Sequence, residues 1–333
     1  MTDPSRTVPG DVAPEIAPSQ ALDDAGGSGT SSSRPPRRRR GMSRRARRDA
    51  LVFLAFAAPN LVLIAMFTYR PLILNIQYSM LDWTLGSRTA TFIGLDNYIE
   101  FFTSAAGLES LRITAIFTLL TVGGAMVLGL LIALALNIDI PGRTVARSAV
   151  FAPYVLSGVG VGLVWLFIFD PNFGVLSWIL RQLGLGSPQW FLDPDMSLVM
   201  VIIVYVLKNL GYCAIVYLGG LQSLSQDVMQ AAELDGAGAV RRFVSVALPL
   251  LSPTTFFLLI TTTLNSLQAF DLLRIMTPTG RGTNTMIFES YLQAFGGYSR
   301  AGYSATISVL LFVILIVMTV AQILFVERKV HYS

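Results

Sequence analysis

The sequence predicts an all-α membrane protein that crosses the bilayer with six transmembrane helices. Hydrophobic residues make up 53% of the 333 positions and charged residues only 13%, whereas soluble domains carry about 25% charged residues. Six segments of 19 to 26 residues contain no charged side chain or, in one case, a single one. A helix needs roughly 20 apolar residues to cross the hydrocarbon core, so each segment is long enough.

Helices are expected rather than strands, because a helix satisfies its backbone hydrogen bonds within itself in lipid. Barrel strands alternate in polarity over about 10 residues, and these uninterrupted runs do not. A shorter apolar stretch, residues 175–185, is expected to form a helix at the outer interface. The six predicted spans are residues 51–69, 113–138, 148–169, 196–218, 249–270 and 301–326.

Residues 1–48 are predicted to form a disordered, basic cytoplasmic tail. They are rich in Pro, Gly, Ser and Arg and have almost no large apolar residues, so they cannot bury enough surface to fold. A secretory signal peptide is the competing interpretation of the apolar run that follows. That run is 19 residues long and ends without an A-x-A cleavage site, so we expect a retained span and a six-helix transmembrane domain over residues 49–333.

The positive charges predict that both termini are cytoplasmic, in the plasma (inner) membrane. From Arg34 onward, fifteen Arg and Lys residues then lie on the inner side and seven on the outer side, and nine of the fifteen are arginines between Arg34 and Arg48. This is the bias of the positive-inside rule. The net charge of +4 could suggest nucleic acid, but the arginines adjoin the first span. We therefore expect the lipid bilayer as a partner and no nucleic acid.

Scarce residue types exclude several kinds of chemistry. The chain has one cysteine, Cys213, one histidine, His331, and two lysines, Lys208 and Lys329. These numbers allow no disulfide within the chain and no Cys/His metal cluster. Neither lysine follows a glycine, so no phosphate-binding loop of the Walker type is present. We expect no metal site and no catalytic residue.

The segment 222–248 is predicted to form two short cytoplasmic helices joined by a glycine turn. Ser225 can cap the first helix, and Gly236 would end it. A second helix would run from Ala239 to Leu248, and Pro249 would mark the start of the fifth span. Small side chains allow close approach of another backbone, so we expect this segment to enter a groove on a partner. A plain loop with an interfacial helix is the alternative.

This segment resembles the EAA loop of binding-protein-dependent ABC importer permeases. Gln230 stands where the family has glutamate, and Val246 stands in place of an isoleucine. Residues 92–98, FIGLDNY, resemble a signature of sugar-type permeases, and the chain from residue 249 onward is most similar to the glycerol-3-phosphate type. The residues that match the EAA pattern are Ala231, Ala232, Asp235, Gly236, Ala237, Phe243, Leu248, Pro249 and Pro253.

The resemblance implies the fold of a type I ABC importer permease, with residues Gln230 to Pro249 coupling the chain to an ATPase. ATP hydrolysis would take place in that separate subunit, so the chain would not be an enzyme and would bind no cofactor itself; ATP and Mg²⁺ would be held by the ATPase. The implied partners are a second similar permease subunit, an ATPase dimer, and an extracellular or lipid-anchored substrate-binding protein.

Polar residues inside the spans indicate a translocation path, because such residues are costly in lipid and are usually functional. In the fourth span they recur at helical spacing and share one face. The resemblance implies that the spans on either side of the EAA loop line the cargo pocket. The candidate path residues are Tyr205, Lys208, Asn209 and Tyr212 of the fourth span and Asn265, Ser266, Gln268 and Asp271 at the outer end of the fifth.

The cargo expected from the resemblance is glycerol-3-phosphate or a glycerophosphodiester such as glycerophosphocholine. A lysine suits a phosphate, whereas aromatic and amide groups suit hydroxyls. A neutral di- or oligosaccharide is the alternative, and Lys208 would then pair with Asp271 or with carbonyls of a partner subunit.

Two other classes of function are disfavoured by the sequence. An ion-coupled secondary transporter would need carboxylates or broken helices at the midplane, and five of the six predicted spans contain no charged residue at all. An intramembrane enzyme would need a catalytic constellation, and no acid pair lies within a span.

Overall fold

The computed structural model describes residues 44–138 and 141–326. Most of the expected basic tail falls outside these residues, as do Arg328, Lys329 and His331. Residues 44–48, assigned to the tail from sequence, instead begin a helix. The chain divides into two compact units, residues 1–60 and 61–333, and each is described on its own.

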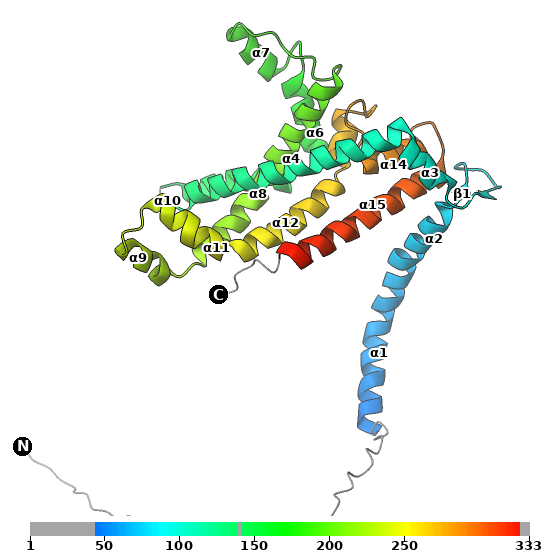
Figure 1. Ribbon diagram of the computed structural model, residues 1–333, viewed down its shortest axis with the longest axis horizontal. Coiled ribbons are helices and arrows are strands. Elements are labelled where there is room, and N and C mark those ends of the chain that lie inside the picture. The colour runs from blue at the N-terminus through cyan, green and yellow to red at the C-terminus, as the bar shows by residue number, and fades with distance from the viewer. Residues whose placement is uncertain (1–43, 139–140, 327–333) are drawn as a thin grey trace, which may run out of the picture. The chain divides into compact units, whose positions relative to one another are not determined.

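The described residues are mainly helical (Figure 1). The helices are α1 (Arg44–Ile64), α2 (Arg70–Tyr78), α3 (Asp96–Thr103), α4 (Ala105–Leu136), α5 (Arg143–Val155), α6 (Gly158–Phe169), α7 (Val175–Gln182), α8 (Pro194–Gln222), α9 (Gln226–Leu234), α10 (Ala239–Arg242), α11 (Leu248–Leu250), α12 (Ser252–Leu267), α13 (Asp271–Met276), α14 (Met286–Phe295) and α15 (Ala301–Ala321). Three π-helical turns are Ala65–Tyr69, Phe243–Ala247 and Gln322–Val326, and two short strands are β1 (Leu81–Asp82) and β2 (Thr91–Phe92).

Five of these helical segments are long and apolar enough to cross a membrane, and a bent pair can form a sixth crossing. The prediction of six transmembrane helices is therefore confirmed, with changed boundaries. The segments are Val52–Tyr78, Ala105–Leu136, Pro194–Gln222, Ser252–Met276, Ala301–Leu324 and the pair Arg143–Val155 with Gly158–Phe169.

The first span does not stop at residue 69, because the helix continues past Arg70 and Pro71. α1 passes through the π-helical turn Ala65–Tyr69 into α2. In this wider turn the N–H of Arg70 donates to the carbonyl of Ala65, five residues earlier. Such a bulge absorbs the proline without ending the helix.

The prediction of residues 148–169 as one helix is wrong. α5 and α6 are separate helices whose axes differ by 101°. The pair nevertheless makes a single crossing. It joins α4 to α8, and these helices run in the same direction, because Phe117 contacts Tyr205 near their starts and Asn137 lies with Leu221 near their ends.

The break between α5 and α6 has a local cause. Leu156 and Ser157 adopt extended backbone conformations, which end the helical hydrogen bonding. Pro153, inside α5, lacks an N–H donor and weakens the helix locally. The Ser157 hydroxyl accepts a hydrogen bond from the N–H of Gly160 and so caps the new helix.

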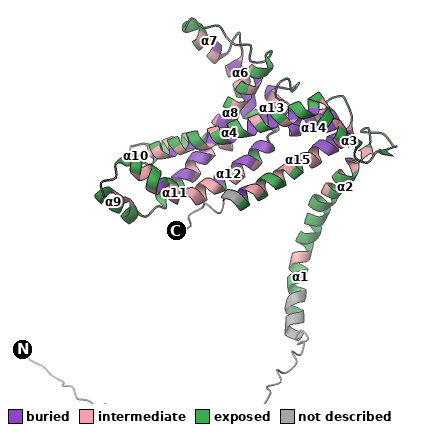
Figure 2. Cartoon of the chain, viewed as in Figure 1, coloured by how far each residue is buried: buried purple, intermediate pink, exposed green. Residues whose placement is uncertain are grey.

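Close packing through small residues joins α8 to α4 and α5. A Cβ added to Gly129 of α4 would lie 2.5 Å from the Cβ of Cys213. A Cβ added to Gly211 of α8 would lie 2.1 Å from the carbonyl oxygen of Val150 in α5. Glycines at membrane helix contacts let backbones approach closely. Buried side chains gather where α8, α12, α14 and the start of α15 meet their neighbours, whereas part of α4 and the later part of α15 remain exposed (Figure 2).

The segment after the first span folds onto the start of α15. β1 pairs antiparallel with β2, and the buried Asn97 amide donates to the carbonyls of Ser79 (3.0 Å) and Leu81 (3.1 Å). The Thr306 hydroxyl of α15 donates to the same Ser79 carbonyl at 3.0 Å. The asparagine of the FIGLDNY segment therefore joins α3 to the end of α2, and Thr306 joins the same point to α15.

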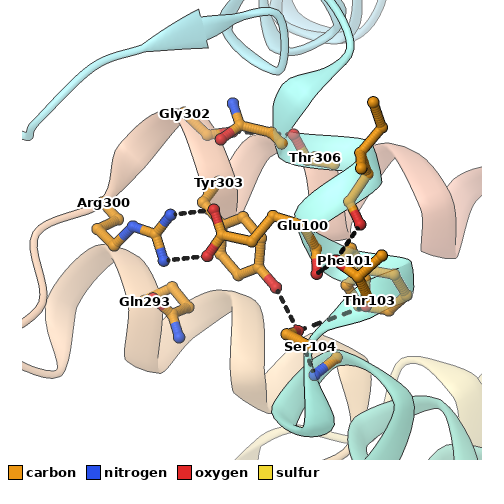
Figure 3. Close-up of polar contacts among 12 residues, drawn as sticks. Glu100, Phe101, Thr103, Ser104, Gln293, Arg300, Gly302, Tyr303 and Thr306 are labelled. Atoms are coloured by element: carbon orange, nitrogen blue, oxygen red, sulfur yellow. Dashed lines mark hydrogen bonds and ion pairs between the residues drawn. The ribbon is translucent and has the colours of Figure 1, made fainter.

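A charged cluster ties α3 to α15 close by (Figure 3). The Arg300 guanidinium donates to both carboxylate oxygens of Glu100, at 2.8 and 2.6 Å. The same guanidinium lies 4.4 Å from the centroid of the Tyr303 ring. Ser104 caps α4 by accepting from the N–H of Gly107, and its hydroxyl lies 3.5 Å from that of Tyr303.

Candidate functional site

The coupling segment, residues 222–248, folds as predicted into two helices joined by a glycine turn. α9 ends where Gly236 adopts a φ of 78°, a left-handed conformation that favours glycine. The N–H of Ala237 donates to the carbonyl of Ala232, and that of Gly236 to Glu233, each at 3.0 Å. This bonding pattern satisfies the last carbonyls of α9, so the turn is a defined structure.

An ion pair between Glu233 of α9 and Arg242 of α10 holds the two helices together. The expected cap is absent, because Ser225 occupies the capping position but its side chain makes no capping hydrogen bond. After Arg242 the chain passes through the π-helical turn Phe243–Ala247 into α11. The coupling segment therefore follows α8 at its N-terminal end and leads through α11 into α12 at its C-terminal end.

The coupling segment presents both small residues and two large apolar side chains. Leu234 is 89% exposed and Val240 is 78% exposed, one on each side of the glycine turn. Neither residue was predicted from the sequence, although apolar residues in a polar segment are a signal for a docking contact. Among the predicted coupling residues, Gln230, Ala231, Asp235 and Gly236 are exposed, and Ala232, Ala237, Phe243 and Pro249 are partly buried.

Gln230 also lines a cavity of about 490 Å³ beneath α9. The ends of α4, α5 and α8 form its other walls, and Arg242 and Glu233 lie at its edge. The amide at position 230 therefore faces a polar cavity within the chain as well as solvent.

A larger cavity of about 690 Å³ lies among α5, α6, α8, α12 and α13. These helices bring together polar groups from the two segments that flank the coupling segment. Six of the eight predicted path residues line the cavity: Tyr205, Lys208, Asn209, Asn265, Gln268 and Asp271.

Tyr205 connects the two polar faces of this cavity. Its hydroxyl donates to the backbone carbonyl of Asn265 in α12 at 2.8 Å. Its own carbonyl accepts from the Asn209 amide, also at 2.8 Å. Because the Tyr205 hydroxyl bonds to the main chain of Asn265, the Asn265 side-chain amide remains available to the cavity.

Lys208 contacts the broken helix. Its ammonium donates to the carbonyl of Tyr154, the penultimate residue of α5, at 3.2 Å, and lies 5.4 Å from the centroid of the Tyr154 ring. Asp271 lines the same cavity but forms no ion pair with Lys208 among the described residues. The hydrogen-bond partner of the lysine is therefore a carbonyl of its own chain, which was not predicted from sequence, rather than Asp271. A carbonyl of a partner subunit stays a prediction.

Tyr212 and Ser266 are placed differently from the other six path residues. The Tyr212 ring stacks on Tyr154 at 4.9 Å, and its hydroxyl donates to the Thr261 hydroxyl at 3.4 Å. Ser266 is buried against α4, with its hydroxyl 2.7 Å from that of Thr121. Tyr212 therefore supports the wall behind Tyr154, and Ser266 joins α12 to α4.

Three aromatic residues of the cavity wall escaped the sequence analysis, namely Phe151, Tyr154 and Phe270. The first two lie in an apolar run whose helical break was not predicted. Pro153 within the run and Gly158 just after it were the signals for a bend. No group of three or more His, Cys, Asp or Glu side chains that could hold a metal occurs in the described part of the chain.

Similarity to known proteins shows the family. The family described as "Binding-protein-dependent transport system inner membrane component" matches residues 125–331. The chain belongs to this family. It is accordingly an inner-membrane permease of a binding-protein-dependent transport system, in agreement with the resemblance of the EAA-like segment.

Individual relatives extend this finding to most of the chain. The sn-glycerol-3-phosphate transport system permease protein UgpA of Agrobacterium fabrum (strain C58 / ATCC 33970) is 33% identical over 281 residues, which cover 83% of this chain and 94% of UgpA. The sulfoquinovosyl glycerol transport system permease protein SmoG of the same organism is 30% identical over 283 residues, which cover 84% of this chain and 92% of SmoG.

A solved structure supports the fold. A chain of a bacterial ABC transporter involved in the import of the acidic polysaccharide alginate superimposes with a TM-score of 0.74 at 22% identity. The match covers 85% of this chain and 96% of that one. A structure of a bacterial alginate ABC transporter with a pentasaccharide-bound periplasmic protein gives a TM-score of 0.75 at 20% identity. The importer-permease fold is thereby confirmed.

Proposed function

We propose that this permease is one of two similar membrane subunits of an ATP-driven importer, and that it carries glycerol-3-phosphate or a glycerophosphodiester. The main support is the cavity of about 690 Å³, which is built largely by the two helical segments joined to the coupling segment, α8 and α12–α13. One cationic side chain, Lys208, lies in this cavity among amide and hydroxyl groups.

The covalent path from the coupling segment to the cavity supports an ATP-driven mechanism. Three residues separate α8 from α9, and one residue separates α11 from α12. An ATPase subunit bound at the exposed turn around Gly236 would move α8 and α12 together as it closes. The coupling segment and both termini would then lie in the cytoplasm, and a substrate-binding protein would deliver cargo from outside. ATP and Mg²⁺ would remain on the ATPase.

The chemistry of the cavity supports a phosphorylated polyol. A lysine ammonium carries three N–H donors and can bind a phosphate through charge-assisted hydrogen bonds. The amides of Asn265 and Gln268 can bind hydroxyl groups. The names of UgpA and SmoG both refer to cargo that contains glycerol, which is consistent with such a site.

A neutral di- or oligosaccharide is the second candidate. It is favoured by one observation, the bond from Lys208 to Tyr154, which gives the lysine a structural use without any anion. The aromatic ring of Tyr154, which lines the cavity, would suit a sugar ring. Broken transmembrane helices such as the α5–α6 pair also occur in ion-coupled transporters, but membership of the binding-protein-dependent permease family favours the importer.

Purification and reconstitution test the proposal. The tagged chain, extracted in mild detergent from its own cell membranes, is expected to co-purify with an ATPase and a second permease. In proteoliposomes, the complex with its binding protein should accumulate radiolabelled glycerol-3-phosphate only with ATP. Preferential ATP-driven uptake of a neutral disaccharide would favour the second candidate, and transport by the chain alone without ATP would refute the importer.

A further inference from the structure

The break in the third span exposes backbone groups inside the membrane domain. Where α5 ends, its last carbonyls lack helical partners, and where α6 begins, its first N–H groups lack them. Such groups must find partners within the protein, because lipid supplies none. Whatever satisfies them therefore also stabilises the 101° bend between the helices.

Lys208 supplies the partner at the carbonyl end. Its ammonium donates to the Tyr154 carbonyl at 3.2 Å. A cation at the C-terminal end of a helix also interacts favourably with the helix dipole. The Tyr154 ring, stacked on Tyr212, lies 5.4 Å from the ammonium and limits where the lysine can go.

An acid occupies the opposite end of the break. A Cβ added to Gly158, the first residue of α6, would lie 3.1 Å from the Cβ of Asp271 and 3.8 Å from its Oδ2 atom. Asp271 thus lies beside the N-terminal end of α6, where a negative charge is favourable. The two charges are separated by the bend, and each complements one end of the broken helix.

Both charged groups also line the cargo cavity. A phosphate that enters the cavity accepts stronger, charge-assisted hydrogen bonds than a backbone carbonyl does. It therefore competes with Tyr154 for the lysine. Removal of Lys208 from the carbonyl would leave the end of α5 without its partner while Asp271 stays at α6.

We propose that Lys208 is a positioning residue that holds the α5–α6 bend in the empty permease, and that an anionic group of the cargo releases the bend by drawing Lys208 away from Tyr154. The second half of this proposal rests on the proposed anionic cargo; the first half does not. The third span, which is the α5–α6 pair between α4 and α8, then couples cargo binding to the angle of its own bend.

Spin-label distances across the bend test this device in the assembled transporter in nanodiscs. Labels at Val145→Cys in α5 and Phe167→Cys in α6 use exposed positions, in a background where the buried Cys213 is replaced by alanine. Leu119→Cys with Leu131→Cys, both exposed on α4, serves as the control pair. The distances are measured in the parent, Lys208→Met and Lys208→Arg proteins without cargo.

In the absence of cargo, Lys208→Met is expected to shift the α5–α6 distance, and Lys208→Arg to keep the parent distance, since arginine retains a cationic donor. Binding protein loaded with glycerol-3-phosphate should shift the parent in the same direction as Lys208→Met, with the α4 control pair unchanged in every case. If Lys208→Met does not assemble, Lys208→Leu, which likewise has no hydrogen-bond donor, replaces it.

A parent-like distance in the cargo-free Lys208→Met or Lys208→Leu protein would overturn the positioning role. An unchanged parent distance on loading, in a complex that does import glycerol-3-phosphate, would overturn the release by cargo. A shift in Lys208→Met with no glycerol-3-phosphate uptake by the parent complex would instead refute the proposed cargo and support the positioning role.

Discussion

Glu100 and Arg300 lie 200 residues apart in the sequence and meet through two hydrogen bonds of 2.8 and 2.6 Å (Figure 3). This pair joins α3 to the start of α15. Its geometry is bidentate, which is the strong form of an arginine–carboxylate contact. Both side chains remain 42% exposed, so solvent screens the attraction and limits its contribution to stability.

Replacement of Glu100 by Gln is expected to destabilise the transmembrane domain by about 1 kcal/mol or less, because it removes the charge and one acceptor from Arg300. The matched control is Glu109→Gln, which breaks the more exposed Glu109–Arg112 pair within α4. Thermal unfolding in detergent should show the larger loss for Glu100→Gln. A loss for Glu109→Gln that equals or exceeds it would contradict the bracing role of the Glu100–Arg300 pair.

The pH dependence of this brace follows from Arg300. Hydrogen bonding to Glu100 raises the pKa of Arg300. A raised pKa in the folded state gives stability that is fully present below the unfolded pKa and is lost only as the pH rises through the folded one. Both values lie far above neutral, so the stability difference between wild type and Arg300→Gln should stay constant between about pH 6 and about pH 9. A progressive fall over that range would show that another group titrates in the cluster.

Substitution of Gly236 by Ala should impair coupling to the ATPase. The φ of 78° at this position strains any residue with a Cβ by about 1–2 kcal/mol, although no atom would collide with the added Cβ. Gly238→Ala is the matched control, since Gly238 has a φ of −61° and the same open surroundings. Cargo-stimulated ATPase activity should fall in Gly236→Ala and persist in Gly238→Ala; an equal response of the two variants would argue against a fixed turn.

Gly211→Ala should disrupt packing of α8 against α5, because the added Cβ would lie 2.1 Å from the carbonyl oxygen of Val150. Overpacking of this kind costs about 1–3 kcal/mol. Gly219→Ala on the same helix meets no atom within 4 Å and should be nearly neutral. Thermal unfolding of the purified complex compares the two, and similar melting temperatures would mean that α5 and α8 do not approach this closely.

Substitutions at Ser266 and Gln268 should distinguish a structural role from a role in transport. Ser266→Ala removes the hydrogen bond to Thr121 and is expected to cost about 1 kcal/mol of stability with the KM for cargo unchanged. Gln268→Ala removes a group that lines the cavity and should raise the KM with little effect on stability. Uptake kinetics and thermal unfolding of both variants test this distinction. A raised KM for cargo in Ser266→Ala would show that Ser266 does contribute to the transport path.

The sequence predicted the number of spans and the position of the coupling segment, because both depend on long local patterns. It did not predict the bend in the third span, since an uncharged apolar run looks the same whether it is straight or broken. Phe151 and Tyr154 were missed for that reason, as their placement depends on the bend. The contact of Glu100 with Arg300 depends on two segments 200 residues apart, which local periodicity cannot connect.

The polar residues of the fourth span show the same limit. Their spacing correctly placed Tyr205, Lys208 and Asn209 on one face, because helical geometry fixes that relation. Tyr212 lies on the same face one turn further along, yet it stacks behind Tyr154. Only the position of the neighbouring α5 decides which of these side chains reaches the cavity.

The selectivity contributed by Lys208 can be measured with two cargoes. Lys208→Ala removes the cationic donor from the cavity, so ATP-driven uptake of glycerol-3-phosphate should fall more than any uptake of a neutral sugar. Loss of the bond to Tyr154 would affect both cargoes alike, because it alters the helix rather than a phosphate contact. Equal losses for the two cargoes would therefore assign Lys208 a purely structural role.

ATP-dependent uptake of radiolabelled glycerol-3-phosphate by the reconstituted complex tests the central claim most directly. The account predicts accumulation that requires this chain, its ATPase and second permease partners, the loaded binding protein and ATP, and that stops when any one is omitted. Accumulation by this chain alone, in vesicles without ATP, would contradict it.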